Sequence, residues 1–361
     1  MSYRKYLSGL ITGFFALIFL CILTVVIVDP AFEYHKPFEF IKPVYSNERY
    51  QNAGIIKNFD YDSVILGSSV TANFRASEFD KFFGGKTAKL TFPGGCFEDF
   101  DTALSFAFET HDIKRVFWSI DPKILMTAYN QQSTPLPDYL YNDSVLDDTK
   151  YVLNKDVLIE MCGESILATL KNTEQNFDDA FTWDNKYDFS SSTAIWSYVR
   201  PEWNPYPYAD DIFDNEINEN LSHIKAFIES HPETEFYLFT PPYSVLYWDR
   251  VTRDGTYLSA LKLYDRLLSE FSNYDNVKYY CFATDLCTLN LNNYIDEVHF
   301  SGDINSQMVE YIATHDGVDA SYMGKMHEFF KNIILAYDFE SLFPDAVQDN
   351  PAKRRTLGND Y

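Results

Sequence analysis

Five short apolar runs, separated by longer stretches, restrict the fold of this chain more than any other sequence feature. The runs are residues 62–67 (DSVILG), 88–93 (AKLTFP), 115–121 (RVFWSID), 235–240 (EFYLFT) and 277–283 (VKYYCFA). Two of the intervening stretches carry apolar residues three and four positions apart, the spacing of one helix face. These residues are Ile217, Leu221, Ile224 and Ile228, and Leu258, Leu261, Leu268 and Phe271. Strands that alternate with helices predict an α/β fold with a central parallel sheet and helices on both faces.

Residues 7–28 form an apolar run of 22 residues without a charge. At ~1.5 Å per residue, such a helix crosses a hydrocarbon core of ~30 Å. Arg4 and Lys5 precede the run and Asp29 follows it, so the positive-inside rule places residues 1–6 in the cytoplasm. A cleaved signal peptide is the alternative, but its apolar segment is shorter, about 7–15 residues, and small-x-small cleavage residues follow it. We therefore expect an uncleaved single-pass anchor in the cell membrane, with the main domain extracytoplasmic.

The remaining chain divides by composition and periodicity. Residues 29–60 are rich in Pro, Tyr and Lys without a clear period, and we interpret them as a juxtamembrane connector. The α/β pattern covers residues 61–335, interrupted at about 126–215 by an insertion rich in Asp, Asn, Tyr and Trp. Residues 336–361 are expected to form a frayed C-terminal tail.

The charge balance excludes several kinds of partner. Asp and Glu number 53 against 29 Lys and Arg, which gives a formal net charge of -24. Nucleic-acid binding and docking on anionic lipid through basic clusters both need a positive surface, so neither is expected. Repulsion also disfavours polyanionic substrates, and a neutral or amino-bearing glycan fits better. Aromatic residues reach 17% and suit sugar-binding grooves, although filling the core is the simpler explanation.

The five cysteines form no C-x-x-C pair and no Cys/His ligand set, so a zinc site is not expected. Cys281 and Cys287 either pair in an oxidising compartment or remain free, and the sequence does not distinguish these alternatives.

A serine-containing turn follows the first predicted strand. Ligands of open parallel sheets bind beyond the carboxyl ends of the strands, and Gly67, Ser68 and Ser69 occupy that position. A serine at a strand-to-helix turn is exposed above free N–H groups and the positive end of a helix dipole. The alternative is that Ser68 or Ser69 only caps a helix that runs to Phe83.

Two further strand ends carry candidate groups. Gly94 and Gly95 follow the second strand, where glycine lets the backbone approach a substrate, although an ordinary tight turn is the alternative. Late in the chain, Asp296 and His299 are three residues apart in one loop. The carboxylate can hold Nδ1–H of the imidazole, which leaves Nε2 free to accept a proton from a serine. A surface histidine beside acidic neighbours is the alternative, and a metal site lacks a recognisable third ligand.

The order of these blocks resembles the SGNH (GDSL-type) hydrolase superfamily. The resemblance implies a three-layer sandwich fold, with Ser69 as nucleophile and Asp296 and His299 as the other members of a triad. It also implies that Gly94, or its neighbour Gly95, supplies an oxyanion N–H. Ser68 stands where the family usually has Asp.

Residues 28–37 (VDPAFEYHKP) and 47–52 (NERYQN) resemble membrane-anchored SGNH-like proteins of Gram-positive bacteria over nearly the whole chain. More distantly, the chain resembles extracytoplasmic proteins that acetylate alginate or D-alanylate teichoic acid. A membrane-bound protein that donates the acyl group is therefore a further candidate partner.

One block departs from the family pattern. Where the family has an Asn that donates to the oxyanion, this chain has Asp121, and a carboxylate donates only when it is protonated. Losing one oxyanion donor typically costs ~10²–10³ in rate. Asn73, one helical turn past Ser69, is a candidate replacement. Tyr243 lies in a Pro-Pro segment after the fourth strand that can shape an acceptor groove, although Pro-Pro also simply ends a strand.

These observations lead to one leading hypothesis and one alternative. The leading hypothesis is a serine esterase or O-acyltransferase that acts on acyl groups of a cell-envelope or exported polysaccharide, without a cofactor or metal. Ser69 would attack the acyl carbonyl, His299 would act as base, and Asp296 would orient the imidazole. The N–H groups of Ser69 and Gly94 would hold the oxyanion. Gly95, Asp121 and Tyr243 would lie near the substrate. The alternative is a non-catalytic module that binds a glycan or a membrane partner during polysaccharide assembly. A hydrogen bond between Ser69 Oγ and His299 Nε2 would favour the enzyme.

Overall fold

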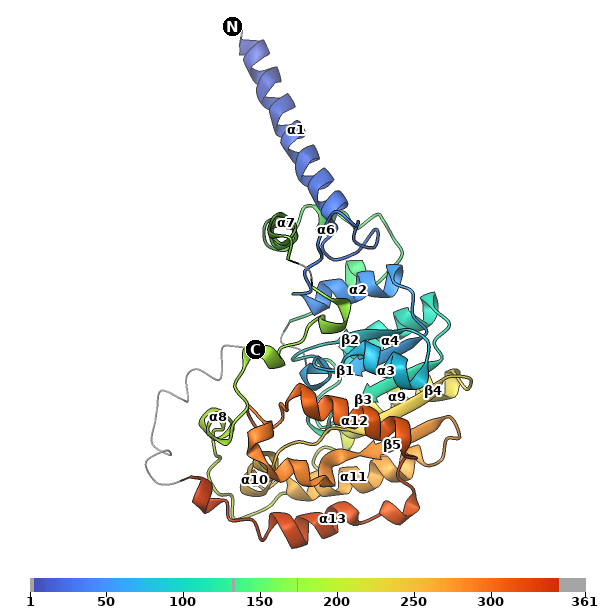
Figure 1. Ribbon diagram of the computed structural model, residues 1–361, viewed down its shortest axis with the longest axis vertical. Coiled ribbons are helices and arrows are strands. Elements are labelled where there is room, and N and C mark those ends of the chain that lie inside the picture. Colours follow the sequence, from blue (N-terminus) through green and yellow to red (C-terminus); the bar gives the residue numbers. More distant parts are fainter. Residues whose placement is uncertain (1–2, 132–133, 174, 344–361) are drawn as a thin grey trace. The chain divides into compact units, whose positions relative to one another are not determined.

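A computed structural model describes residues 3–131, 134–173 and 175–343. Its centre is a five-stranded parallel sheet with strand order β2-β1-β3-β4-β5 (Figure 1). The strands are β1 (Ser63–Gly67), β2 (Thr87–Thr91), β3 (Arg115–Ser119), β4 (Glu235–Thr240) and β5 (Val277–Cys281). Every one of the five predicted strands is confirmed, and so is the α/β class. Most of the predicted C-terminal tail, residues 344–361, lies outside the described residues.

Helices cover both faces of the sheet. On one face, Phe117 of β3 and Tyr237 of β4 are register partners, and Phe83 contacts both rings at 4.8 and 5.1 Å between centroids. On the opposite face, Trp118 contacts Phe227 at 6.1 Å. The helices of this architecture include α3 (Ala76–Phe83), α4 (Phe97–Thr110), α9 (Asp214–Ser230), α11 (Tyr257–Phe271) and α12 (Gly302–Thr314). Alternate side chains of each buried strand therefore pack into two separate helical layers.

The two helix faces predicted from periodicity differ in how well they agree with the structure. All the predicted apolar residues of α9 are buried. In α11, Leu261, Leu268 and Phe271 are buried, but Leu258 is 36% exposed. The buried face of this helix contains Ala260 and the residues that lie one and two helical turns after it. Leu258, in the first turn, lies outside this face.

The remaining α-helices of the described residues include the long first helix. They are α1 (Tyr3–Val28), α2 (Glu48–Asn58), α5 (Pro122–Leu125), α6 (Thr149–Val152), α7 (Cys162–Lys171), α8 (Ser191–Ser197), α10 (Val245–Asp254) and α13 (Lys325–Phe329). The chain forms two compact units. Of the described residues, unit 1 comprises those up to 60 together with those in 102–110 and 135–181, and unit 2 comprises those in 61–101, 111–134 and 182–343. The predicted insertion at 126–215 is thus divided between the units.

Unit 1 has a hydrophobic core of its own. It contains Val25, Val28, Ala31, Ile41, Ala53, Leu140, Tyr151, Val152, Val157, Met161 and Cys162. The segment 29–60, predicted to be a connector, contributes to this core and holds α2. The side chain of Asn47 caps α2 by accepting from the N–H of Tyr50. The buried residues of α2 include polar Gln51 and Asn52 as well as Ile55 and Ile56. Because polar and apolar residues are buried together, the sequence of this segment shows no apolar period.

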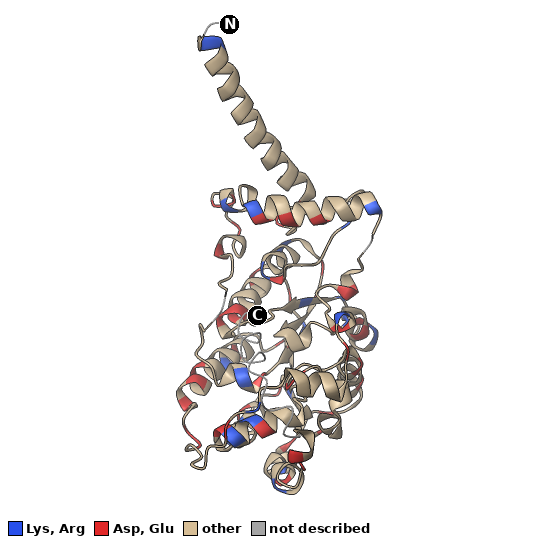
Figure 2. Cartoon of the chain, turned by 90° about the vertical axis from the view of Figure 1, so that its left-hand side faces the viewer, with Lys and Arg blue, Asp and Glu red and all other residues tan. Residues whose placement is uncertain are grey.

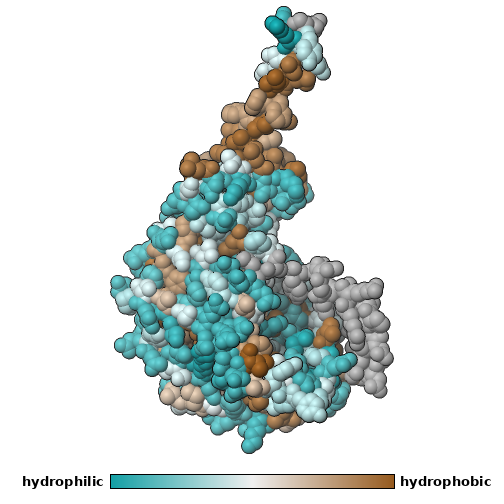
Figure 3. Space-filling model, turned by 180° about the vertical axis from the view of Figure 1, so that it is seen from behind, coloured by the Kyte–Doolittle hydropathy of each residue, from teal (hydrophilic) through white to brown (hydrophobic). Residues whose placement is uncertain are grey.

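Helix α1 has 26 residues and is ~39 Å long at 1.5 Å per residue. Within the described part of the chain it is the one helix long and apolar enough to cross a membrane, and an N-terminal helix of this kind is either an anchor or a signal sequence. Figure 2 shows charged residues only at its N-terminal end, and Figure 3 shows the hydrophobic surface along it. The five cysteines all lie among the described residues and are free, so Cys281 and Cys287 do not pair.

Candidate active site

The turn after β1 depends on a glycine. Gly67 has a φ of +157°, and a Cβ at this position would lie 2.6 Å from Thr71 Cγ2 and 2.8 Å from Ser119 Cβ. The carbonyl oxygen of Ser68 accepts hydrogen bonds from the hydroxyl groups of Thr71 and Thr91, each at 2.7 Å. The chain therefore turns sharply at the carboxyl end of β1 and is held there by its neighbours.

The two serines of this turn have different roles in the structure. Ser69 begins a short 3₁₀ turn, η1 (Ser69–Thr71), and the helix that ends at Phe83 starts only at Ala76. The alternative that Ser68 or Ser69 only caps a helix that runs to Phe83 is therefore wrong. The side chain of Ser68 makes no cap hydrogen bond to η1 and instead donates to Asp121 Oδ2 at 2.7 Å.

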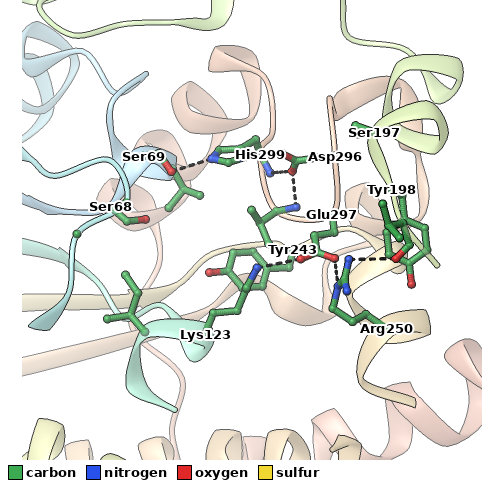
Figure 4. Close-up of a pocket in the computed structure, with 16 residues that line it drawn as sticks. Ser68, Ser69, Lys123, Ser197, Tyr198, Tyr243, Arg250, Asp296, Glu297 and His299 are labelled. Carbon is green, nitrogen blue, oxygen red and sulfur yellow. Dashed lines mark hydrogen bonds and ion pairs between the residues drawn. The ribbon is translucent and has the colours of Figure 1, made fainter. Parts of the chain in front are cut away.

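Ser69, His299 and Asp296 form one hydrogen-bonded chain (Figure 4). Ser69 Oγ lies 2.7 Å from His299 Nε2, and His299 Nδ1 lies 2.6 Å from Asp296 Oδ2. Both contacts are satisfied when the proton of the neutral imidazole is on Nδ1, so that Nδ1–H donates to Asp296 and the serine hydroxyl donates to Nε2. Nε2 is then positioned to accept the serine proton.

Asp296 is held as a carboxylate. Its Oδ1 accepts from the N–H groups of Val298 and His299, both at 2.8 Å. Burial alone would raise the pKa of Asp296, but the imidazole of His299 and these two N–H groups outweigh burial and keep the pKa below its usual range. An ionised Asp296 both orients the ring and stabilises the imidazolium that forms when His299 takes a proton.

The loop that carries Asp296 and His299 is closed on itself. Ser301 donates its N–H to the carbonyl oxygen of Asn293 at 2.9 Å, and Ile295 donates to that of His299 at 3.1 Å. The segment is also fixed from outside, because the N–H and the hydroxyl of Ser244 donate to the Glu297 carbonyl oxygen at 2.9 and 3.0 Å. The histidine is thus held by backbone contacts, a requirement for a preorganised base.

Two backbone N–H groups near Ser69 are free to bind an oxyanion. No described residue accepts a hydrogen bond from the N–H of Ser69 or of Gly94. Gly94 has a φ of +63° and lines the same pocket as Ser69. The N–H of Gly95 instead donates to the Phe92 carbonyl oxygen at 2.8 Å, so Gly94 is the better donor of the two glycines.

Asp121 lies behind the pocket and does not line it. It is 2% exposed, and it accepts hydrogen bonds from the hydroxyl groups of Ser68 and Tyr243. Burial raises the pKa of Asp121, partly opposed by these two donors. Tyr243 does line the pocket, but its hydroxyl is directed at Asp121. These two hydrogen bonds of Asp121 join the segments that follow β1 and β4, and its predicted substrate-binding role stays a prediction.

Asn73 also holds a neighbouring segment. Its Oδ1 accepts from the N–H groups of Trp183 and Asp184 at 2.9 and 3.1 Å. Asn73 does not line the pocket at Ser69, and its buried Nδ2 has no partner among the described residues. The side chain that it positions is Trp183, whose Nε1–H donates to the Ser69 carbonyl oxygen at 2.9 Å and whose ring meets His299 edge-on at 5.3 Å. Nothing in the sequence indicated Trp183, which lies in the predicted insertion.

The pocket beside Ser69 has a volume of about 440 Å³. Its lining also includes Lys123, Ile124, Ser197, Tyr198, Val199, Arg250, Glu297 and Val298. Figure 4 shows Glu297 between two cations: Lys123 Nζ donates to it at 2.8 Å, and Arg250 Nε donates to its other oxygen. The Arg250 guanidinium lies over the Tyr198 ring at 5.1 Å. Sequence reasoning missed this ion group, because its members are far apart in the chain.

In the described part of the chain, no group of three or more His, Cys, Asp or Glu side chains is arranged to hold a metal ion. A scan against protein-family models gives no match to this chain, and a comparison with curated proteins finds no similar sequence.

Proposed function

We propose that this chain is a membrane-anchored, extracytoplasmic serine esterase or O-acyltransferase of the SGNH type. It would act on acyl groups of a cell-envelope or exported polysaccharide. The observation that carries the proposal is the hydrogen-bonded chain from Ser69 Oγ through His299 to Asp296, with distances of 2.7 and 2.6 Å. These three residues come from two segments far apart in the sequence, and this geometry matches the arrangement that activates a serine nucleophile.

The reaction would proceed through an acyl-enzyme. His299 Nε2 takes the proton of Ser69 as Oγ bonds to the acyl carbonyl carbon, and the N–H groups of Ser69 and Gly94 stabilise the resulting oxyanion. The imidazolium then gives its proton to the departing alcohol, and the bond between the acyl carbon and that alcohol breaks. Water or a sugar hydroxyl next attacks the acyl-enzyme while His299 accepts its proton. Ser69 leaves with that proton, and the product is a free acid or a new ester.

The charge of the chain supports a neutral or amino-bearing glycan as substrate. The net charge of -24 repels polyanions at long range. Within the pocket, Lys123 and Arg250 are already paired with Glu297, which leaves little positive charge to attract an anionic group.

The structure of unit 1 supports an uncleaved anchor. Val25 and Val28, in the last turn of α1, are buried in the core of this unit. The next residue, Asp29, accepts from the N–H groups of Glu33, Tyr34 and His35 and from the hydroxyl of Tyr151. Removing α1 as a signal peptide would take away part of this core, which argues for an anchor that stays attached.

A non-catalytic binding module remains the second candidate because of Asp121. In the superfamily that the chain resembles, an Asn at this place donates to the oxyanion. Both carboxylate oxygens of Asp121 accept hydrogen bonds from hydroxyl groups, so this side chain offers no donor to the pocket while it is ionised.

The test uses the full-length chain in detergent, a fluorophosphonate probe and p-nitrophenyl acetate. We expect labelling that Ser69→Ala abolishes and that Ser68→Ala, the neighbouring control, retains. Rapid ester turnover would favour an esterase. Labelling with slow turnover would favour transfer to an acceptor that the assay lacks. No labelling of a folded protein would favour the binding module.

A further inference from the structure

An exposed apolar helix face lies in unit 1. The π-helical segment η3 (Asp156–Met161) continues directly into α7, so that residues 156–171 form one helical stretch. One side of it, which includes Val157 and Met161, is buried in the core of the unit. The other side exposes large apolar residues: Ile159 at 69%, Ile166 at 41%, Leu167 at 50% and Leu170 at 80%.

These exposed residues share one helix face. Ile159, Gly163, Ile166, Leu167 and Leu170 follow the spacing of four, three, one and three residues that keeps side chains on one side of a helix. A Cβ built on Gly163 meets no atom within 4 Å, so the face is open at its centre. A contiguous exposed apolar strip of this kind marks an interaction surface.

The strip borders the end of the candidate membrane span. Both α7 and η3 contact α1, and Met161 shares a core with Val25 and Val28 at the end of α1. Figure 1 shows α7 end-on while α1 runs along the picture, and in Figure 2 the same helix runs across the lower end of α1. A helix that crosses the end of a membrane span runs along the membrane surface, not into it.

A pair of aromatic rings lies near the same end of α1. Phe38 and Phe40 are 41% and 68% exposed, and their rings stack with centroids 5.4 Å apart. His35 connects this pair to the span: its ring lies 4.2 Å from that of Phe38, and its Nε2 hydrogen-bonds to the carbonyl oxygen of Val26 at 3.0 Å. Phe is one of the residues that interfacial segments bury at the boundary between headgroups and acyl chains, which is where α1 would leave the hydrocarbon.

We infer that the exposed face of residues 156–171 lies in the interfacial region of the outer leaflet of the bilayer, as an amphipathic helix beside the span. The inference rests on the proposed anchoring by α1 and not on the proposed chemistry of Ser69. Continuity with the span is the reason for choosing lipid as the occupant over a second copy of the chain or another protein.

Apolar side chains, not charges, would attract the exposed face of residues 156–171 to the bilayer. The charged residues of the stretch are Asp156, Glu160, Glu164 and Lys171, one positive and three negative. Such a helix gains nothing from anionic lipid, and alone it would bind weakly. Attachment to α1 raises its effective concentration at the membrane, so the burial of a few side chains suffices. The consequence is a second membrane contact that restricts rotation of unit 1 about the end of α1.

The test is site-specific photocrosslinking of the full-length chain in phosphatidylcholine liposomes. p-Benzoylphenylalanine replaces Leu170 on the exposed face, Leu17 at a 61% exposed position within α1, or Glu219 at an exposed polar position of α9. After irradiation, intact-mass measurement distinguishes a phospholipid adduct from a protein adduct. We expect phospholipid adducts at Leu170 and Leu17 and none above background at Glu219.

The possible outcomes distinguish failure of the lipid contact at residues 156–171 from failure of α1 as an anchor. Adducts at Leu17 without adducts at Leu170 would overturn the inference while leaving the anchor intact. A crosslink from Leu170 to a second copy of the chain would overturn it in favour of self-association. Absence of lipid adducts at Leu17 would refute the anchor and the inference together. None of these results bears on the labelling of Ser69.

Discussion

The indole N–H of Trp183 donates to the backbone carbonyl oxygen of Ser69 at 2.9 Å, while the same ring meets His299 edge-on. One side chain thus contacts the two residues whose separation decides whether a proton can move between them. Trp183 is itself held by Asn73, which accepts from its backbone N–H. Trp183 is a positioning residue in this account, because it acts on the geometry of the pair and not on the reacting atoms.

Trp183→Phe is expected to slow labelling of Ser69 by up to about tenfold. The substitution keeps an aromatic ring against His299 but removes the N–H, and a hydrogen bond contributes ~0.5–1.5 kcal/mol. The measurement is the second-order rate constant for reaction with a fluorophosphonate. A rate equal to that of the wild type would mean that the hydrogen bond to Ser69 has no part in positioning it.

Asp296→Asn is expected to reduce labelling by about 10³–10⁴, as loss of the correct imidazole tautomer does in serine hydrolases. The carboxylate of Asp296 accepts a hydrogen bond from Nδ1–H of His299. An amide nitrogen in place of that oxygen would favour the tautomer of His299 whose proton is on Nε2, and a protonated Nε2 cannot accept the proton of Ser69. The variant should fold, because its side chain is isosteric. Unchanged labelling with an unchanged melting temperature would remove Asp296 from the mechanism.

Asp121→Asn tests whether this position affects the oxyanion. Because Asp121 does not line the pocket, we expect labelling to change less than tenfold. An increase approaching the ~10²–10³ of a new oxyanion donor would show instead that the side chain at position 121 reaches the reacting atoms.

The same variant changes how stability depends on pH. Burial raises the pKa of Asp121 in the folded chain above its value in the unfolded chain. The folded state therefore holds the proton more tightly, and stability falls as pH rises from the unfolded pKa of ~3.9 through the folded pKa. Asp121→Asn lacks this group, so the melting temperature of the wild type should fall relative to that of the variant across this range. A constant difference would contradict the raised pKa.

Glu297→Gln is expected to lower the free energy of unfolding by about 1.5–3 kcal/mol, the size of a hydrogen bond to a charged group. The carboxylate of Glu297 is shared by Lys123 and Arg250, and the variant leaves the Arg250 charge without its anion. Lys123→Met is the matched control and should cost less, because the Lys123 side chain is 47% exposed. If both variants lowered the free energy of unfolding equally, the pairing of Arg250 with Glu297 would make no contribution of its own to stability.

The sequence predicts the sheet well because its signals are local. Each strand is a short apolar run, and the carboxyl ends of parallel strands meet at one edge of the sheet. The positions of Ser69 and Gly94 after their strands therefore suffice to predict that they line the same pocket. Asp296 and His299 are neighbours in one loop, and their spacing suffices to predict their contact.

The residues that sequence reasoning missed depend on long-range packing. Trp183 is 114 positions from Ser69, and Lys123 is 174 positions from Glu297. No pattern within one segment indicates such pairs. Helix α2 was missed for a different reason, since polar Gln51 and Asn52 are buried in it and conceal its amphipathic period.

The central claim is that Ser69 is a nucleophile activated by His299, and mapping the site of covalent modification tests it most directly. The full-length chain would be treated with a fluorophosphonate, digested and analysed by tandem mass spectrometry, beside His299→Ala. We predict one adduct on the Ser69 side chain that is lost in His299→Ala. A folded wild-type chain that carries no adduct, or carries it on another residue, would contradict the account.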